Sequence, residues 1–482
     1  MACGPIQQVI RGPLVACCSK ALTTPRPWRR PRRLAADAAC SPPDALPRRR
    51  RGEALARIDA HDVLDGMPPP EEKRKKEDEV ARAEAAGDRV GALPDALLHH
   101  VLLFLPAEEA VRTCVLARRW RSLWRSAAGL RIGCLREHEP TSVKDLRRFV
   151  EYLLLLRGGA PLDTCELQIG DFRGRDDVPR VNLWFRHAVL CKVRALKLHV
   201  HNSQRVHIWL ELDDLPLVSQ HLTRLQLHGV RCHASFLNFS SCPSLEHLEF
   251  EYCDFSVAKK ISSKSIRSLT IIFSAFPINS RIRISAPNLV SLHLDDLWDK
   301  TPILDSMPAL SEAFVRITNR CDDYCSKLLV ASEDCDCEAC KSSHSIGNGG
   351  NNCVILKGLS EAKSLVLISR PELFIFKRDL RRCPTFSNLK TLLLNDYWCV
   401  PDDLHELACL LKHSPVLEKL TLQLFSEGPN HKMEMRGIFN SMERSAGISE
   451  YLKIVEIKCE VIDERVFKVL KFLCTFNIHF SC

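Results

Sequence analysis

The chain has 482 residues, a formal net charge of +9 and 23 cysteines. Its length allows several domains, and its charge gives no reason to expect a nucleic-acid partner: residues 1–51 hold eleven Arg or Lys against Asp37 and Asp44, so the remainder is close to neutral. The odd number of cysteines, scattered through apolar segments, favours reduced thiols over a disulfide framework. No run of about 18 apolar residues is present, so we expect no membrane span.

Residues 1–86 are rich in Arg, Pro and Ala and have no apolar periodicity. Such a segment buries too little apolar surface to offset the entropy lost on ordering, so we predict a disordered basic tail. Three roles stay open for it: a solvated tail without a role of its own, a nuclear-localisation signal, or an organelle transit peptide. An alternative start at Met67 would remove most of the segment.

The composition changes at Asp88, where a helical module is predicted. The first helix is expected between Pro94, near its first turn, and Pro106, which cannot continue it. A second short helix should run from residue 107 to about residue 116, and a third from residue 118 to residue 124.

The first of these helices is too apolar for a single buried face. Its main stripe has helical spacing and comprises Leu97, Leu98, Val101, Leu102 and Leu105. Leu103 and Phe104 fill the opposite side. A helix that is apolar all round lies deep in a large core or is covered by a partner, and a module of about 40 residues has no large core. We therefore expect a partner protein to cover part of this helix.

From residue 160 onward the pattern apolar-x-x-apolar-x-apolar recurs. It occurs at Leu162, Cys165, Leu167; Val193, Leu196, Leu198; Leu222, Leu225, Leu227; Leu245, Leu248, Phe250; Ile266, Leu269, Ile271; Leu289, Leu292, Leu294; Leu310, Ala313, Val315; Ala362, Leu365, Leu367; Leu389, Leu392, Leu394; Leu417, Leu420, Leu422; and Leu452, Val455, Ile457. The middle units repeat every 21 to 23 residues, which is typical of a solenoid. Stacked units would share one core, and their strands would form a parallel sheet along one concave wall.

Residues 88–124 resemble the plant F-box motif. The resemblance rests on Leu93-Pro94-Asp95, on Leu105-Pro106, and above all on the segment 115–124 with Arg118-Arg119-Trp120 and Leu123-Trp124. Cys114 and Ala117 depart from the Ser often found at their positions.

The C-terminal part resembles the FBD module that often follows leucine-rich repeats in plant F-box proteins, through segments 386–392, 410–420 and 452–457. The expected fold is therefore α/β: a small all-α F-box module, a leucine-rich-repeat solenoid and a C-terminal FBD module. The expected parts are a tail (1–86), the F-box (87–131), leucine-rich repeats (160–320), a flexible Cys/Gly/Asn insertion (321–353), and irregular repeats with the FBD module (354–482).

The resemblance implies a non-catalytic substrate-recognition subunit of an SCF-type E3 ubiquitin ligase, in the cytoplasm, the nucleus or both. Its partners would be a Skp-type adaptor, the cullin of the complex and an unknown protein substrate. The residues that would form or support the adaptor surface are Leu93, Pro94, Leu97, Leu98, Val101, Leu105, Pro106, Val111, Trp120, Leu123 and Trp124. The alternative is an interaction scaffold that uses its repeats without assembling a ligase.

Two further groups of residues are candidate sites. Six residues could supply zinc ligands, namely Cys321, Cys325, Cys335, Cys337, Cys340 and His344, but their spacing lacks paired Cys-x-x-Cys sets and favours a flexible insertion without metal. Histidines near the strands could line the concave face: His199, His201, His207, His228 and His233. No catalytic triad, carboxylate pair or phosphate loop stands out, so we expect neither an enzyme nor a cofactor.

Overall fold

The computed structural model describes residues 93–133, 141–170, 172, 176–201, 209–318, 320–322, 353–370, 375–399, 404–424, 433–439, 449–476 and 478–481. All of these lie in the second of two compact units, residues 78–482. The basic tail and nearly all of the Cys/Gly/Asn insertion lie outside the described residues. None of the helices in the described ranges is both long and apolar enough to span a membrane.

The helices are short and fall into two groups, an N-terminal cluster and segments that connect strands. They are α2 (Asp95–Phe104), α3 (Ala107–Arg112), η1 (Thr113–Val115), α4 (Trp120–Leu123), α5 (Val143–Arg157), α6 (Asp177–Leu190), η2 (Phe239–Ser241), α8 (Ile375–Leu380), η3 (Asp396–Cys399), α9 (His405–Lys412) and α10 (Glu464–Cys474).

Most strands belong to one 14-stranded sheet in the order β1-β2-β3-β5-β7-β9-β11-β13-β14-β15-β16-β18-β17-β19. Its strands are β1 (Gly129–Ile132), β2 (Thr164–Ile169), β3 (Ala195–Val200), β5 (Arg224–His228), β7 (His247–Glu251), β9 (Ser268–Ile272), β11 (Ser291–Asp295), β13 (Glu312–Arg316), β14 (Ser364–Ile368), β15 (Thr391–Asn395), β16 (Lys419–Leu424), β17 (Met433–Phe439), β18 (Ile454–Cys459) and β19 (Ile478–Ser481). Neighbours from β1 to β18 are parallel, whereas β17 pairs antiparallel with β18 and β19.

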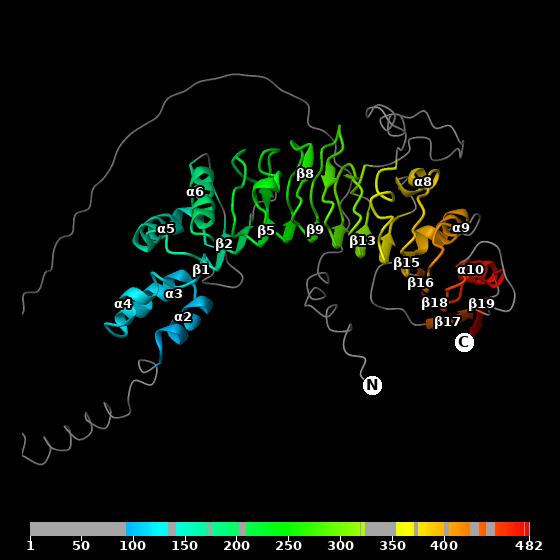
Figure 1. The fold of residues 1–482 in the computed structure, drawn as a ribbon, viewed down its shortest axis with the longest axis horizontal. Coiled ribbons are helices and arrows are strands. Elements are labelled where there is room, and N and C mark those ends of the chain that lie inside the picture. Colours follow the sequence, from blue (N-terminus) through cyan, green and yellow to red (C-terminus); the bar gives the residue numbers. More distant parts are fainter. Residues whose placement is uncertain are drawn as a thin grey trace, which may run out of the picture. The chain divides into compact units, whose positions relative to one another are not determined.

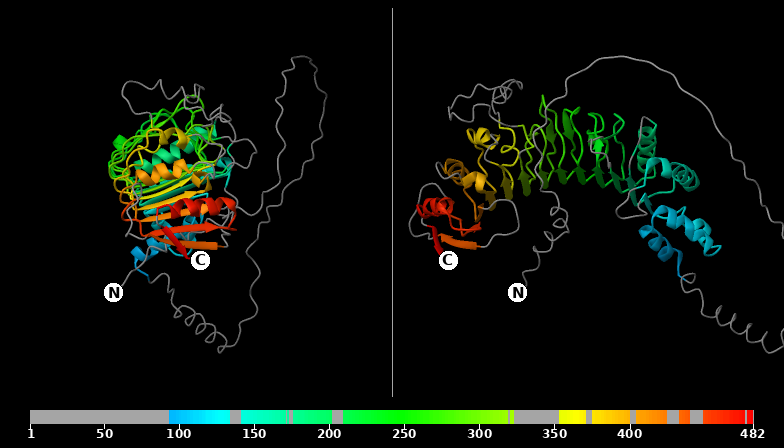
Figure 2. Two further views of the ribbon diagram at one scale, coloured as in Figure 1. Left: turned by 90° about the vertical axis from the view of Figure 1, so that its right-hand side faces the viewer. Right: turned by 180° about the vertical axis from the view of Figure 1, so that it is seen from behind.

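Two smaller sheets lie within the connections of the repeats. One pairs β8 (Lys260–Ser262), β10 (Arg283–Ser285) and β12 (Ile303–Leu304), and the other pairs β4 (Leu210–Glu211) with β6 (Val230–Arg231). The helices α5, α6, α8 and α9 lie with these connections on one side of the main sheet (Figure 1), and the view from behind shows the same arrangement (Figure 2). This arrangement is an α/β solenoid that follows a small helical module, as the sequence pattern predicts.

The repeat pattern marks the core of the solenoid. Every apolar residue of the eleven predicted units is exposed by 3% or less. Within the strands the buried residues alternate with half-buried ones, so one face of the sheet packs into the core and the other is partly open. The registers align equivalent positions from strand to strand, as in Leu248↔Leu269 and Leu269↔Leu292.

A turn follows each of several strands and places its first residue in the left-handed region. Gly133 and Gly229 take this conformation, and so do Tyr252, Phe273 and Asp296. At Gly229 a Cβ atom would lie 2.3 Å from the carbonyl oxygen of Val200, so the neighbouring strand leaves no room for a side chain. Tyr252 and Phe273 adopt the strained conformation and stack on each other with ring centroids 5.0 Å apart.

The helical module is joined to the sheet through β1, a strand that the repeat pattern does not predict. Arg131 of β1 donates a hydrogen bond to the carbonyl of Phe104 at the end of α2 (2.8 Å). Arg157, buried at the end of α5, donates to the carbonyls of Trp124 and Ala127, both at 2.8 Å. The helical module and the first repeats therefore share side-chain contacts, not only a linker.

Candidate protein-interaction surfaces

The helix α2 presents an apolar face that the described residues leave uncovered. Leu97, Val101 and Phe104 are 50%, 45% and 65% exposed. Their spacing of four and three residues puts them on one side of the helix. Leu98 and Leu102 are buried on the other side. Leu103, which the sequence pairs with Phe104 on the surplus face, instead lies against Gly129 at the start of β1.

Two further apolar side chains of the helical module are open to solvent. Val115 and Leu116, at the end of η1, are 82% and 67% exposed. They belong to the motif that suggested the F-box, but they were not among the predicted adaptor residues. The signal that could have found them is a pair of large apolar residues that only Ala117 separates from the charged Arg118-Arg119 pair.

The predicted adaptor residues divide into three groups by burial. Pro94, Leu97 and Val101 are exposed. A second group is half-buried and comprises Leu93, Leu105, Pro106 and Val111. A third group lies in the core and comprises Leu98, Trp120, Leu123 and Trp124. The third group can support the surface but cannot contact a partner without unfolding the module.

Ion pairs and hydrogen bonds hold the helices of the module together around this core. Asp95, in the first turn of α2, accepts a hydrogen bond from Nε of Arg119 at 2.7 Å. Ser126 and His99 lie within hydrogen-bonding distance of each other, at 3.2 Å. Burial raises the pKa of Glu108 in α3 above its ordinary value. The two hydrogen bonds join α2 to the residues around α4, and the buried side of α2 packs in the same core as Trp120 and Leu123.

The partly open face of the main sheet offers a second surface. One side chain from each of ten successive strands forms a row in register, which we call the outer row: Arg131, Glu166, Lys197, Gln226, Glu249, Thr270, His293, Phe314, Val366 and Leu393. All ten are half-buried.

The outer row is charged toward β1 and apolar toward β15. Glu166 is paired with Arg131 at 3.1 Å and with Lys197 at 3.3 Å. Burial acts to raise the pKa of Glu166, but a hydrogen bond from Gln168 and the charge of Lys197 together lower it. The apolar end consists of Phe314, Val366 and Leu393, and His293 stacks on Phe314 with centroids 4.4 Å apart. A face with charged and apolar ends is suited to a protein surface.

Two of the predicted histidines meet beside the outer row. His199 and His228 stack with ring centroids 3.9 Å apart and an interplanar angle of 11°. Burial, followed by the neighbouring His228, lowers the pKa of His199 to about 4. Burial also lowers the pKa of His228. Of the other three, His233 contacts Glu211 at 2.8 Å, His201 is exposed, and His207 lies outside the described residues.

The residues weighed as zinc ligands in the insertion are almost all outside the described residues. Cys321 is described, and it is buried in the solenoid.

Known proteins are similar both to the helical module and to the chain over most of its length. The F-box domain model matches residues 92–129. The F-box/FBD/LRR-repeat proteins At5g22660 and At5g22700 of Arabidopsis thaliana are each 28% identical to the chain. The first aligns over 72% of this chain and 79% of its own length, and the second over 80% and 89%. The FBD-associated F-box protein At4g10400 of the same plant is 28% identical over 48% of this chain and 61% of its own.

The described helices α2 to α4 coincide with the F-box match, and the parallel sheet begins at its last residue, Gly129. Such a combination of modules serves protein–protein interaction. The chain contains an F-box domain at residues 92–129, and over most of its length it is similar to plant F-box proteins with leucine-rich repeats and an FBD region.

Proposed function

We propose that the chain is the substrate-recognition subunit of an SCF-type ubiquitin ligase. In this role its F-box binds a Skp-type adaptor, which links it to a cullin, and its repeats bind the protein to be modified. The chain itself supplies binding surfaces and no chemistry. The reduced thiols expected from the sequence are compatible with the cytoplasm or the nucleus, where the ligase would act.

The observation that carries the proposal is the exposed apolar face of α2. Three large apolar side chains of one short helix are about half exposed or more, although the opposite side of the helix is buried in the core. A small domain gains nothing in stability from such a face, whereas a partner that covers it removes the apolar surface from water. Val115 and Leu116, outside α2, are two further exposed apolar residues of the same module.

The proposal is tested by measuring adaptor binding with surface variants. The full chain should co-purify with a plant Skp-type adaptor, and the double substitution Leu97→Asp, Val101→Asp should weaken binding at least a hundredfold, because two charges would be buried at the interface. The matched control is Val257→Asp, Ile278→Asp, which changes two similarly exposed apolar residues of the repeats. If the control loses adaptor binding equally, the α2 face is not the contact.

A second outcome concerns the alternative role. If neither the wild type nor any variant binds the adaptor while the chain is folded by circular dichroism, the chain acts as a repeat scaffold without ligase assembly.

Whether or not the chain binds an adaptor, its contacts with the target protein would come from the outer row, where Phe314, Val366 and Leu393 supply the apolar end. A Phe314→Asp substitution should then abolish target binding and leave adaptor binding unchanged.

A further inference from the structure

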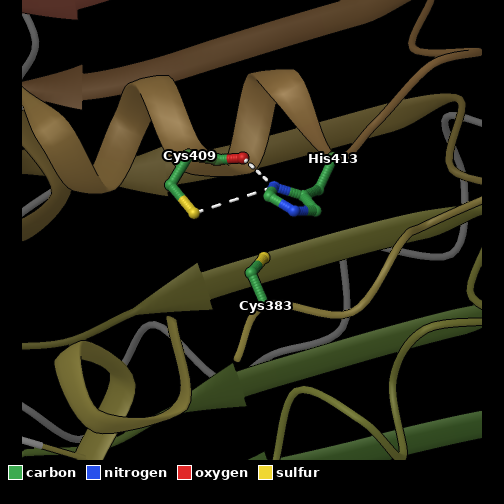
Figure 3. A group of neighbouring side chains, drawn as sticks. All are labelled: Cys383, Cys409 and His413. Atoms are coloured by element: carbon green, nitrogen blue, oxygen red, sulfur yellow. Dashed lines mark hydrogen bonds between the residues drawn. The ribbon is translucent and has the colours of Figure 1, made fainter. Parts of the chain in front are cut away.

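The C-terminal repeats bring two cysteines and a histidine together. Cys409 and His413 are four residues apart at the end of α9, which places them on one side of the helix. Cys383 comes from the loop after α8. The two sulfur atoms and a ring nitrogen of His413 all lie within 4.8 Å of one another. Figure 3 shows the three side chains directed toward a common space, Cys409 and His413 from the helix and Cys383 from the loop facing it.

The main chain already holds these two segments together. The N–H of Phe386, three residues after Cys383, donates to the carbonyl of His413 at 2.8 Å. The N–H of His413 donates to the carbonyl of Cys409 at 3.1 Å. The three side chains are therefore brought together by the fold of the repeats and not by a free loop.

The hydrogen bonds of His413 indicate which ring nitrogen carries the proton. Its Nδ1 lies 2.8 Å from the carbonyl oxygen of Cys409. A carbonyl oxygen only accepts, so Nδ1 is the donor and the lone pair remains on Nε2. A histidine that binds a metal through Nε2 ordinarily donates its Nδ1–H to a carbonyl or a carboxylate, and the carbonyl of Cys409 supplies such an acceptor.

The two thiols have main-chain acceptors within reach. The Sγ of Cys383 donates to the carbonyl of Pro384 at 3.5 Å, and the Sγ of Cys409 donates to the carbonyl of Leu380 at 3.9 Å. The Sγ of Cys409 also lies 3.7 Å from Nδ1 of His413. A metal ion would displace the protons that both thiols hold.

We propose that Cys383, Cys409 and His413 bind a zinc ion that ties the loop after α8 to the end of α9. Two thiolates and one imidazole are ligands that Zn²⁺ prefers, and a water molecule would complete a tetrahedron. The absence of a carboxylate from the three argues against Ca²⁺ or Mg²⁺. Zinc–sulfur bonds of about 2.3 Å require donor atoms about 3.8 Å apart, so small side-chain rotations suffice.

A similar pair on α6 provides an internal comparison. His187 and Cys191 are also four residues apart, with Nδ1 and Sγ at a distance of 3.5 Å. Within the described part of the chain, however, only the group at Cys383 brings three potential ligands together. The pair on α6 and the pair on α9 therefore share the four-residue spacing of a cysteine and a histidine. The third ligand, Cys383, distinguishes the proposed site.

The test uses the full chain, stripped with a chelator and titrated with Zn²⁺ against a chromophoric competitor. We expect one tight equivalent per chain, lost in Cys383→Ser and in Cys409→Ser. Two controls should retain it: Cys474→Ser, which removes an exposed thiol, and the triple substitution Cys335→Ser, Cys337→Ser, Cys340→Ser in the insertion. Retention of the equivalent in Cys383→Ser, or its loss in the triple variant, would overturn the proposal.

A second readout, the absorption of bound Co²⁺, uses the wild type alone, and thermal unfolding then compares it with a variant. Co²⁺ added to the stripped wild type should give thiolate-to-cobalt charge-transfer absorption with the visible bands of a tetrahedral site, displaced by Zn²⁺. The stripped Cys383→Ser chain should unfold at the same temperature as the stripped wild type, while Zn²⁺ raises only that of the wild type. A wild type that binds neither metal, or that instead forms a Cys383–Cys409 disulfide under the same conditions, contradicts the proposal.

Discussion

Adjacent side chains of α2 occupy opposite environments. Leu97 is half exposed and Leu98 is fully buried, and the same contrast separates Val101 from Leu102. Each buried residue is part of the core that also contains Trp120 and Leu123. A substitution at a buried position would therefore unfold the module and remove adaptor binding indirectly. Only the exposed positions separate a binding role from a stabilising one.

The stacked pair His199 and His228 should make stability depend on pH. Both pKa values are lowered in the folded chain, that of His199 to about 4, so the folded chain takes up these protons at lower pH than the unfolded chain, whose histidines titrate near pH 6.5. Stability is then fully present above about pH 6.5 and falls as the pH decreases toward about 4.

The measurement is the thermal unfolding midpoint at several pH values. Between pH 7 and pH 5, the midpoint should fall less in the variant His199→Gln, His228→Gln than in the wild type. His221→Gln, at an exposed position, serves as the control. Equal pH dependence in the wild type and the double variant would show that the stacked pair is not responsible.

At the level of elements, the turns after the strands determine how closely neighbouring repeats approach. Gly229 follows β5 and Gly158 ends helix α5, and both lie in the left-handed region, with φ of 72° and 60°. A Cβ atom at Gly229 would meet the carbonyl of Val200 at 2.3 Å, whereas nothing lies within 4 Å of one at Gly158.

These two glycines form a matched pair for mutation. Gly158→Ala should lower the free energy of unfolding by about 1 kcal/mol, the cost of a side chain in the left-handed region. Gly229→Ala should lower it by about 3 kcal/mol or more, because a strand must also move. Denaturant unfolding of the two variants measures the difference. Equal losses would mean that the contact with Val200 relaxes freely.

The strands of the repeats could be predicted because their core residues follow a fixed spacing that a single sequence displays. Strand β1 and helix α5 were missed for different reasons. The strand β1 is one short alternation, Leu130 and Ile132, which completes the sheet only through its pairing with β2. Helix α5 carried local signals: Ser142 accepts a hydrogen bond from the N–H of Asp145, and Gly158 ends the helix.

The candidate surfaces were less accessible to sequence reasoning. The apolar residues of α2 surround the whole helix, and the contact of Leu103 with Gly129 decides which side faces the sheet. That contact joins residues 26 positions apart, so helical spacing cannot reveal it. The cluster of Cys383, Cys409 and His413 was missed for the same reason, because its third member comes from a different repeat unit.

At the scale of the whole molecule, one continuous core connects the F-box to the repeats. The buried residues of α2 and α4 belong to the same cluster as those of the sheet, and Arg157 of α5 donates to the carbonyls of Trp124 and Ala127. In the proposed role, this shared core would keep a bound target near the adaptor. Transfer of ubiquitin to the target requires that proximity.

The most direct test of this account is native mass spectrometry of the chain mixed with a Skp-type adaptor and a cullin. We predict a single species that contains one copy of each protein, and its loss when the chain carries Leu97→Asp and Val101→Asp. A mixture in which the folded chain remains alone, while adaptor and cullin associate with each other, would contradict the assignment of the chain as a ubiquitin-ligase receptor.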